Sequence, residues 1–358
     1  MFFLNRNVLS RNIRNVNAFN GANIKNTNML PATPEVSATQ ATQATQPTQA
    51  TQATQATQPT QATQATQATQ ATQATQATQA SPGEARKLVS KNHIEEENKR
   101  KLYAMPYILS KTHYSPIIPL TIYQTWYTKD LPPSMQKNVY KLKTQNPEFS
   151  YQLYDDNDCR EFIRINFSPD VLHAYDMLIP GAYKADLWRY CVLYKNGGMY
   201  IDIKLSCING FKLIELCEAE HYVLDREIPS IFNTQTPIYN AFMVCKKNNP
   251  FLLEAIHKVV RNVKNKYYGF NALYPTGPGM LSETIHETKM KGINPIMNID
   301  MHHYYNSTFL VYRERFIISL AYPGYRNDQI ELYKKINKKN YTYHWIEGNI
   351  YTNTEGAK

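Results

Sequence analysis

A three-residue repeat fills residues 38–80 and limits what the first part of this chain can become. It consists of fourteen triplets, twelve Ala-Thr-Gln and two Pro-Thr-Gln, followed by Ala80. Without charged, aromatic or large apolar side chains, the segment cannot offset an ordering cost of roughly 1 to 2 kcal/mol per residue. Pro47 and Pro59 argue against one continuous helix, and a triplet period without Gly is neither collagen nor a solenoid. We therefore expect a disordered linker or stalk.

The repeat separates regions of different composition. We expect residues 1–37 to be a disordered polar N-terminus, residues 81–112 a charged and partly helical linker, and residues 354–358 a tail. After residue 112, Tyr, Ile, Leu and Phe become frequent, as a packed core requires. The sequence therefore predicts one folded domain at residues 113–353, preceded by a low-complexity region.

The net charge of +10 is unevenly distributed along the chain. Residues 1–112 contain 11 Lys or Arg and 5 Asp or Glu, a net charge of +6, whereas residues 113–358 contain 28 and 24, a net charge of +4. The predicted domain is thus mildly basic and has no basic stripe interleaved with aromatic residues. We therefore expect no nucleic-acid partner, although a small anion such as a diphosphate would suit this charge.

The cysteines and apolar runs give three further expectations. The five cysteines are an odd number and contain no C-x-x-C pair, which predicts buried free thiols rather than a zinc site. No stretch approaches the roughly 20 apolar residues of a transmembrane helix. The first residues lack a signal-peptide core, and their acid-free, Arg-containing composition leaves a mitochondrial presequence as an alternative.

Strands and helices alternate through the predicted domain. We expect strands within 117–123, 149–153, 199–203, 222–224 and 238–245, and helices after Pro132, Asp156, Ser168, Pro180 and Pro250. Gly197 and Gly198 are typical of a left-handed helix end. This order predicts an α/β fold with a mixed sheet flanked by helices. Asp202 would lie near the carboxyl end of a strand, where open α/β sheets bind ligands.

Several ordered motifs carry a family resemblance. They are Ile122–Trp126, Ala185–Tyr190, Gly197–Lys204, Asn240–Phe242, Thr276–Pro278 and His344–Trp345. In this order and spacing they resemble the family 32 glycosyltransferases, which have a DXD sugar-binding region and are related to fungal Golgi mannosyltransferases. Versions with Ile-Lys after the first Asp resemble those encoded by large DNA viruses.

The resemblance implies a fold, an activity and partners. The fold would be GT-A-like, and the activity a retaining transfer from a UDP- or GDP-linked sugar to a glycan or glycoprotein acceptor. A divalent ion, manganese or magnesium, often assists at the donor site of this family. A viral origin would place the protein in the host cytoplasm or in the virion.

Carried over residue by residue, the resemblance assigns the donor site. Asp202 would be its centre, contacting the donor ribose and a metal. Trp126 would stack on the nucleotide base, the alternative being an ordinary buried Trp. Asp186 and Arg189 lie three residues apart on one helix face, where Asp186 would hold sugar hydroxyls; a surface ion pair is the alternative. The other expected donor-binding residues are Gln124, Thr125, Gly198, Tyr200 and Asn240.

Two positions depart from the family pattern. Tyr123 stands where the family usually has His, and Lys204 replaces the second DXD carboxylate. An ammonium group cannot coordinate a metal, so Lys204 would either face the diphosphate itself or point away while Asp225 and His344 help to hold the ion. Because side chains alternate along a strand, we expect Lys204 to share a face with Asp202.

The replacement at Lys204 also leaves a second function open. The chain could keep the fold but have lost turnover, as a lectin-like or virion-associated protein tethered by the Thr-rich stalk. Turnover of a nucleotide sugar distinguishes an enzyme from such a binding protein.

Overall fold

The computed structural model describes residues 96–225, 237–289, 297–304, 306–336 and 339–352. The expectations for residues 1–37, for the repeat and for the tail lie outside these residues. Of the expected linker, residues 96–112 are described, and 96–103 form a helix.

The described residues form an α/β domain whose elements follow the expected order. The helices are α4 (Pro133–Gln145), α5 (Asp156–Asn166), α6 (Pro169–Met177), α7 (Gly181–Asn196), α8 (Pro250–Lys264), α9 (Pro278–Lys289), α10 (Tyr325–Ile336) and α11 (Tyr341–Ile346). The strands are β1 (Thr121–Thr125), β2 (Ser150–Tyr154), β3 (Gly198–Ile201), β4 (Ser206–Cys207), β5 (Phe242–Cys245), β6 (Asp300–Tyr304), β7 (Ser307–Tyr312) and β8 (Arg315–Ser319). No helix within the described segments is both long and apolar enough to cross a bilayer.

The central sheet is mixed, as the sequence predicts. Its strand order is β2-β1-β3-β5, with β1 parallel to both β2 and β3 and with β5 antiparallel to β3. A second, antiparallel sheet has the order β4-β8-β7-β6. The β3 strand, fully buried between β1 and β5, runs from Gly198 to Ile201 and delivers the chain to Asp202.

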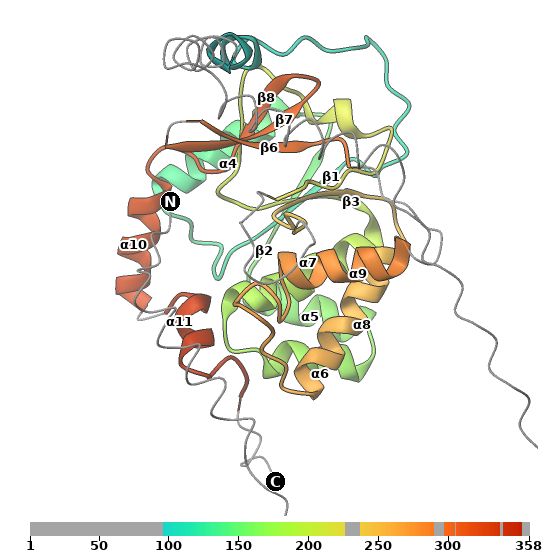
Figure 1. Ribbon diagram of the computed structural model, residues 1–358, viewed down its shortest axis with the longest axis vertical. Coiled ribbons are helices and arrows are strands. Elements are labelled where there is room, and N and C mark those ends of the chain that lie inside the picture. The colour runs from blue at the N-terminus through green and yellow to red at the C-terminus, as the bar shows by residue number, and fades with distance from the viewer. Residues whose placement is uncertain (1–95, 226–236, 290–296, 305, 337–338, 353–358) are drawn as a thin grey trace, which may run out of the picture. The chain divides into compact units, whose positions relative to one another are not determined.

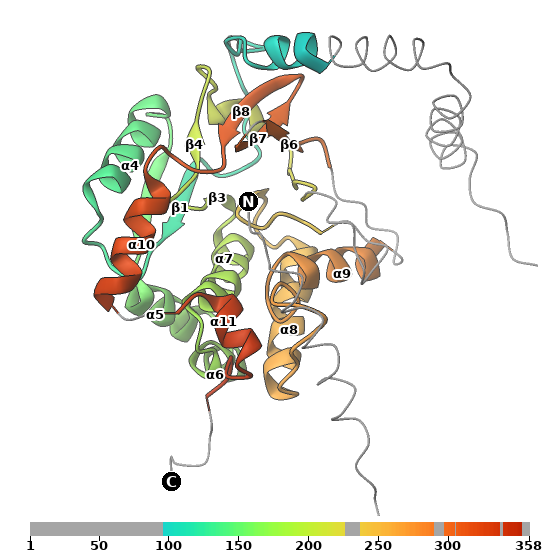
Figure 2. The ribbon, with the colours of Figure 1, turned by 60° about the vertical axis from the view of Figure 1, so that its left-hand side comes forward.

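Helices and the second sheet cover the central sheet. The helices α5, α6, α7 and α8 gather on one side of it, whereas β6, β7 and β8 lie on the other (Figure 1). Two separate apolar cores, one centred on Trp188 of α7 and one on Phe211 and Ile317, fill these two spaces. The C-terminal helix α10 lies at the edge of the domain in both views (Figure 2) and contacts α4. The following helix α11 contacts α7.

Some element boundaries differ from the expected ones. The first strand begins at Thr121 rather than residue 117, because Pro119 has no N–H for a sheet ladder. Of residues 222–224, only Val223 and Leu224 form isolated bridges, and the following strand begins at Phe242 rather than at residue 238. The order of the remaining elements is as expected.

The start of α5 is also corrected by one residue. Asp155, not Asp156, is its N-cap: the Asp155 side chain accepts a hydrogen bond from the Asp158 N–H at 2.9 Å. The Asp158 side chain in turn accepts one from the Asp155 N–H at 3.1 Å, which completes a capping box.

The turn from α7 into β3 requires glycine at two successive positions. Gly197 and Gly198 have φ angles of +66° and +110°. A Cβ atom on Gly197 would lie 2.6 Å from the Lys247 nitrogen, and one on Gly198 would lie 2.7 Å from the Thr121 carbonyl oxygen. The expected left-handed helix end is therefore confirmed, and it fixes the register of β3 against β1.

The cysteines are free and buried, as the sequence predicts. Burial raises the pKa of Cys207 and of Cys217 to about 12. Burial likewise raises the pKa of Cys191, which lies on the buried face of α7. The thiols therefore pack as small apolar groups and stay protonated at neutral pH.

One buried carboxylate fastens the segment that precedes β1 to the domain. Glu215, on the turn at Leu213–Leu216, has a fully buried side chain. It accepts hydrogen bonds from the Tyr107 hydroxyl at 2.5 Å, from the Ser110 N–H at 2.7 Å and from the Tyr114 hydroxyl. Three donors more than a hundred residues away in sequence thus converge on one side chain.

We expect Glu215→Gln to destabilise the domain by about 1.5 to 3 kcal/mol at neutral pH, because it weakens hydrogen bonds to a charged acceptor. Burial alone would raise the pKa of Glu215, but the hydrogen bonds from Tyr107, Tyr114 and Ser110 outweigh burial and hold it below its ordinary value of 4.5. A carboxyl with a lowered folded pKa stabilises fully above its unfolded pKa and loses that contribution as pH falls through the folded value.

Urea unfolding of wild type and variant should therefore differ most at neutral pH and converge as the pH falls below about 4. Glu161→Gln, at an exposed carboxylate paired with Arg164, is the matched control and should leave unfolding unchanged. Equal urea midpoints for Glu215→Gln and wild type at neutral pH would show that the Glu215 carboxylate does not stabilise the domain.

Candidate functional site

The proposed centre of the site lies at the carboxyl end of the central strand. Asp202 follows the last residue of β3, Ile201, and its backbone N–H donates to the Ala241 carbonyl at 2.8 Å. Its side chain is 22% exposed, so it is sheltered and still reachable from outside. Position and partial exposure both agree with the expectation for a ligand-binding carboxylate.

A buried ion pair on α7 lies beside Asp202. The Asp186 and Arg189 side chains are 11% and 7% exposed, and Arg189 Nη2 lies 3.4 Å from Asp186 Oδ1. Asp186 also accepts hydrogen bonds from Asn240 Nδ2 at 2.9 Å and from the Thr276 hydroxyl at 2.8 Å. This burial decides against the alternative of a solvated surface pair.

Arg189 links the two carboxylates. Its Nη2 atom lies 3.5 Å from Asp202 Oδ1, and its Nη1 atom donates to the Asn240 carbonyl at 3.0 Å. The guanidinium lies 4.4 Å from the centre of the Tyr200 ring, and the Tyr200 hydroxyl donates to Asp202 Oδ1 at 2.7 Å. Asp186, Arg189, Tyr200, Asp202 and Asn240, all expected site residues, therefore form one connected network.

Lys204 lies next to the Asp202 carboxylate, but for a different structural reason than expected. Strand alternation does not place it there, because β3 ends at Ile201 and a turn comes next, closed by a hydrogen bond from the Leu205 N–H to the Asp202 carbonyl at 2.9 Å. The turn nevertheless brings Lys204 Nζ to 3.3 Å from Asp202 Oδ2. Its side chain is 30% exposed, whereas that of Arg189 is 7% exposed.

The surroundings move the two carboxyl pKa values in opposite directions. Burial alone would raise the pKa of Asp202, but Arg189 and Lys204 outweigh burial and hold it below its ordinary value. Burial raises the pKa of Asp186 above its ordinary value, although Arg189, Thr276 and Asn240 oppose this. Asp202 is therefore the carboxylate that stays charged in acid.

Three other expected residues have partners inside the fold. Gln124 is fully buried and joins strands, donating from Nε2 to the Ile201 carbonyl at 3.0 Å. The Thr125 hydroxyl donates to the Tyr154 carbonyl at 2.9 Å. Gly198 lies at the opposite end of β3 from Asp202, in the turn that leads from α7 into this strand. These contacts hold the strand ends that carry the site.

Trp126 and Tyr239 each carry a buried donor. Within the described residues, the Trp126 indole N–H and the Tyr239 hydroxyl are buried and have no hydrogen-bond partner. Trp126 packs in the apolar cluster that contains Ile203 and Tyr325. Leaving a buried donor unpaired costs about 1 to 3 kcal/mol. Four other described residues also have such an atom, so this feature alone does not locate a ligand; they are Arg100, Gln145, Trp188 and His302.

Tyr239 and Tyr325 can be recognised as neighbours of Asp202 only once the fold is known. Burial raises the pKa of Tyr239, and the charges of Asp202 and Asp225 raise it further. Burial, followed by the charge of Asp202, also raises the pKa of Tyr325. Tyr239 directly precedes the expected Asn240, but a tyrosine in a chain with 27 of them carries no signal without the fold.

The donor set beside Asp202 does not fit a divalent metal. Asp202 Oδ1 faces Tyr200 and Arg189, and Oδ2 faces Lys204, so two cations already flank the carboxylate. Among the described residues, no three His, Cys, Asp or Glu side chains gather in a way that could hold an ion. His344, one of the expected ligands, instead pairs through Nδ1 with Asn349 Oδ1 at 2.9 Å.

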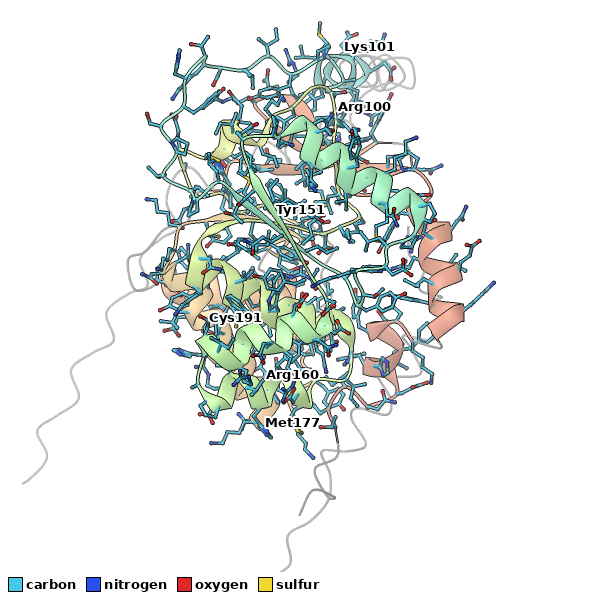
Figure 3. All side chains as sticks on the ribbon, turned by 180° about the vertical axis from the view of Figure 1, so that it is seen from behind. Arg100, Lys101, Tyr151, Arg160, Met177 and Cys191 are labelled. Atoms are coloured by element: carbon cyan, nitrogen blue, oxygen red, sulfur yellow. The ribbon has the colours of Figure 1, made fainter. Side chains whose placement is uncertain are left out.

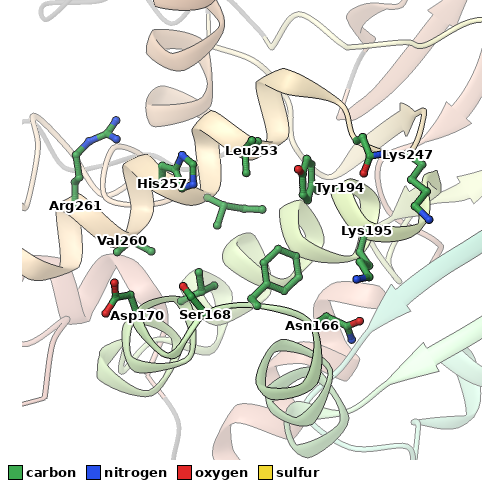
Figure 4. Close-up of a pocket in the computed structure, with 14 residues that line it drawn as sticks. Asn166, Ser168, Asp170, Tyr194, Lys195, Lys247, Leu253, His257, Val260 and Arg261 are labelled. Carbon is green, nitrogen blue, oxygen red and sulfur yellow. The ribbon is translucent and has the colours of Figure 1, made fainter.

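A surface cleft of about 670 Å³ lies elsewhere, between α6, the C-terminal end of α7 and α8 (Figure 4). Its lining includes Tyr194, Lys195, Lys247, His257 and Arg261. None of the expected donor-site residues lines it. The basic side chains at its rim are exposed, and the buried network of charged groups is centred on Asp202 instead.

Comparison with known proteins shows which families and structures this chain resembles. A family model described as "Glycosyltransferase sugar-binding region containing DXD motif" matches residues 132–221. The match spans the Asp186–Arg189 pair and the segment from Gly197 to Lys204. The solved structure "PaToxG Glycosyltransferase" aligns with a TM-score of 0.39 and 18% identity, covering 57% of this chain and 80% of that chain.

Curated relatives include fungal and viral proteins. "Inositol phosphoceramide mannosyltransferase 3" of Schizosaccharomyces pombe is 32% identical over 177 residues, 48% of this chain and 46% of that protein. "Initiation-specific alpha-1,6-mannosyltransferase" of Candida albicans is 26% identical over 218 residues, 52% and 55% respectively. An uncharacterized glycosyltransferase of Acanthamoeba polyphaga mimivirus is 32% identical over 93 residues, 25% and 37% respectively. The chain thus spans about half or less of the length of each of these relatives, and its residues 132–221 are similar to the DXD-containing sugar-binding region of glycosyltransferases.

Proposed function

We propose that this chain transfers a sugar from a nucleotide-sugar donor to an acceptor, with retention of configuration at the anomeric carbon. The observation that carries the proposal is the buried network of Asp186, Arg189 and Asp202 at the carboxyl end of β3. Asp186 and Asn240 offer oxygen and amide groups to sugar hydroxyls, and Trp126 offers an aromatic face to the base. The unpaired Tyr239 hydroxyl adds one donor beside Asp202.

We propose further that Lys204 supplies the positive charge that the leaving diphosphate requires. In the usual DXD site, two carboxylates and one divalent ion together carry no net charge. In this chain, Asp202 and Lys204 together also carry no net charge, so the lysine can replace both the second carboxylate and the ion. The ammonium group is the more exposed of the two cations at Asp202, because Arg189 is buried and shared with Asp186. Charge placed in advance where a leaving group develops its own charge is a large contribution to catalysis.

A panel of UDP- and GDP-linked sugars tests the proposed function. The relatives named as mannosyltransferases make GDP-mannose the first donor to try. A bound donor at a hundred times its Kd should raise stability by about 2.7 kcal/mol, and turnover should persist when manganese is removed with a chelator. Donor binding without turnover would favour the alternative of a binding protein. If no donor either stabilises the protein or is consumed, the proposed function is wrong.

We expect Lys204→Ala to weaken donor binding by about 1.5 to 3 kcal/mol, the value of a hydrogen bond to a charged partner. Lys204→Asp should instead make turnover depend on manganese, because it restores a second hard oxygen ligand. Calorimetry with donor and rate measurements across manganese concentrations provide the readout. Lys195→Ala, at the far end of α7, is the matched control and should bind donor like wild type. Full manganese dependence of wild type together with normal Lys204→Ala activity would show that the lysine has no part in the site.

A further inference from the structure

Exposed apolar side chains gather in the segment that leads into the domain. Of the twelve large hydrophobic residues that are exposed in the described part of the chain, five lie within 102–117. They are Leu102, Met105, Ile108, Leu109 and Ile117, with exposed fractions of 37%, 52%, 85%, 42% and 49%. Single exposed apolar residues are ordinary, but such a concentration within sixteen residues marks an interaction surface.

The segment is largely exposed, but a few tyrosines hold it against the domain. Tyr103 is buried and meets the Phe316 ring edge-on, with 5.5 Å between centroids. The Tyr107 N–H donates to the Asn209 carbonyl at 2.7 Å, and its hydroxyl donates to Glu215. The tyrosines thus anchor the backbone while Ile108 and its apolar neighbours remain outside, which presents a preformed surface.

Cations accompany the apolar side chains. Residues 96–117 contain the basic residues Lys99, Arg100, Lys101 and Lys111 against the acidic residues Glu96 and Glu97. Lys101 is exposed directly beside Leu102. Arg100 and Lys101 lie at one end of the molecule, and Arg160 of α5 lies toward the other (Figure 3). Arg100 is paired with Glu96 and Lys111 with Glu218. The positive charge beside the apolar side chains therefore comes from Lys99 and Lys101.

We propose that residues 99–111 dock this protein onto an anionic lipid bilayer. Apolar side chains enter the boundary between headgroups and acyl chains, and neighbouring Lys and Arg are attracted to anionic headgroups. No groove that would accept a peptide is needed, because a bilayer surface takes up separate protruding side chains such as Met105, Ile108 and Leu109. Basic residues next to protruding apolar ones favour a lipid surface over a protein partner.

The proposal goes beyond sugar transfer and does not rely on it. Peripheral docking of this kind requires no membrane-spanning helix, and it can be measured without donor or acceptor. Each protruding side chain contributes separately to membrane binding, so a single substitution should weaken the interaction. A substitution at Ile108 should not unfold the domain, because this side chain is 85% exposed.

Flotation of the full chain with vesicles is the test. We expect wild type to float with vesicles of phosphatidylcholine and phosphatidylserine, and less with phosphatidylcholine alone. Ile108→Asp should reduce the bound fraction at least about tenfold, because it removes an inserting side chain and adds a repelled charge. Ile165→Asp, at a 65% exposed isoleucine on α5, is the matched control and should float like wild type.

A second variant separates the electrostatic contribution to vesicle binding from the apolar contribution. Lys99→Glu combined with Lys101→Glu should remove the preference for phosphatidylserine while leaving thermal unfolding unchanged. Failure of wild type to float with either vesicle overturns the proposal. So does equal flotation of Ile108→Asp, since the lipid contact would then lie elsewhere in the chain. Self-association in solution that Ile108→Asp abolishes, without any flotation, would assign the surface to a second copy of this chain instead.

Discussion

Asp202→Asn should lower turnover of the nucleotide sugar by at least about a hundredfold, the loss seen when one preorganised electrostatic contact is removed from an active site. The substitution keeps the size of the side chain and deletes the charge that faces both Arg189 and Lys204. Because those cations hold the pKa of Asp202 below its ordinary value, the carboxylate is charged throughout the neutral range, and the effect should not vary there with pH.

The experiment compares initial rates with each donor, with circular dichroism as a check of the fold. Asp176→Asn is the control, because Asp176 is also paired with an arginine, Arg160, but lies at the surface. It should turn over donor at the wild-type rate. Turnover of Asp202→Asn within a few-fold of wild type would remove Asp202 from the centre of the site.

Arg189→Met should have the largest effect on stability, a loss of about 3 to 5 kcal/mol in the free energy of unfolding. The guanidinium balances Asp186 and Asp202, and the Asp186 side chain is only 11% exposed. Removing one partner of a buried pair leaves a charge that neither water nor a counter-ion compensates. Methionine keeps much of the volume, so the loss reports charge more than packing.

Adding Asp186→Asn to Arg189→Met should restore part of the lost stability, because the uncompensated charge is then gone. Denaturant unfolding of the two single variants and the double variant gives the coupling energy directly. Arg160→Met, at the exposed pair with Asp176, should unfold like wild type. If the double variant is less stable than Arg189→Met by the full cost of Asp186→Asn, the two side chains are not energetically coupled.

Much of the domain could be predicted because local physical rules fix it. Proline favours the first turn of a helix, and two successive glycines favour a left-handed helix end. The structure has prolines at the starts of α4 and α6 and Gly197–Gly198 at the end of α7. The burial of Asp186 and Arg189 was predictable from their apolar neighbours. The carboxyl end of β3 as the location of Asp202 follows from the order of elements.

Other features depend on contacts distant in sequence. Tyr239 is next to Asp202 only because β3 and β5 pair, and nothing in its own surroundings in the sequence predicts this. Lys204 lies beside Asp202 through a turn, whereas the sequence suggested strand alternation, so the expected neighbour was found for a different reason. Glu215 shows no signal in the sequence, yet its side chain is buried and accepts hydrogen bonds from three residues about a hundred positions earlier.

The buried cysteines can report on local unfolding of this protein. Because every thiol in the chain is buried and burial raises its pKa, a thiol reagent added to the folded protein meets no reactive group. Labelling can proceed only after the chain opens, so its rate measures how often each part of the domain unfolds. Cys191 at the centre of α7 and Cys217 beside the Glu215 turn would report separately on the donor site and on the anchored segment, without any label being engineered.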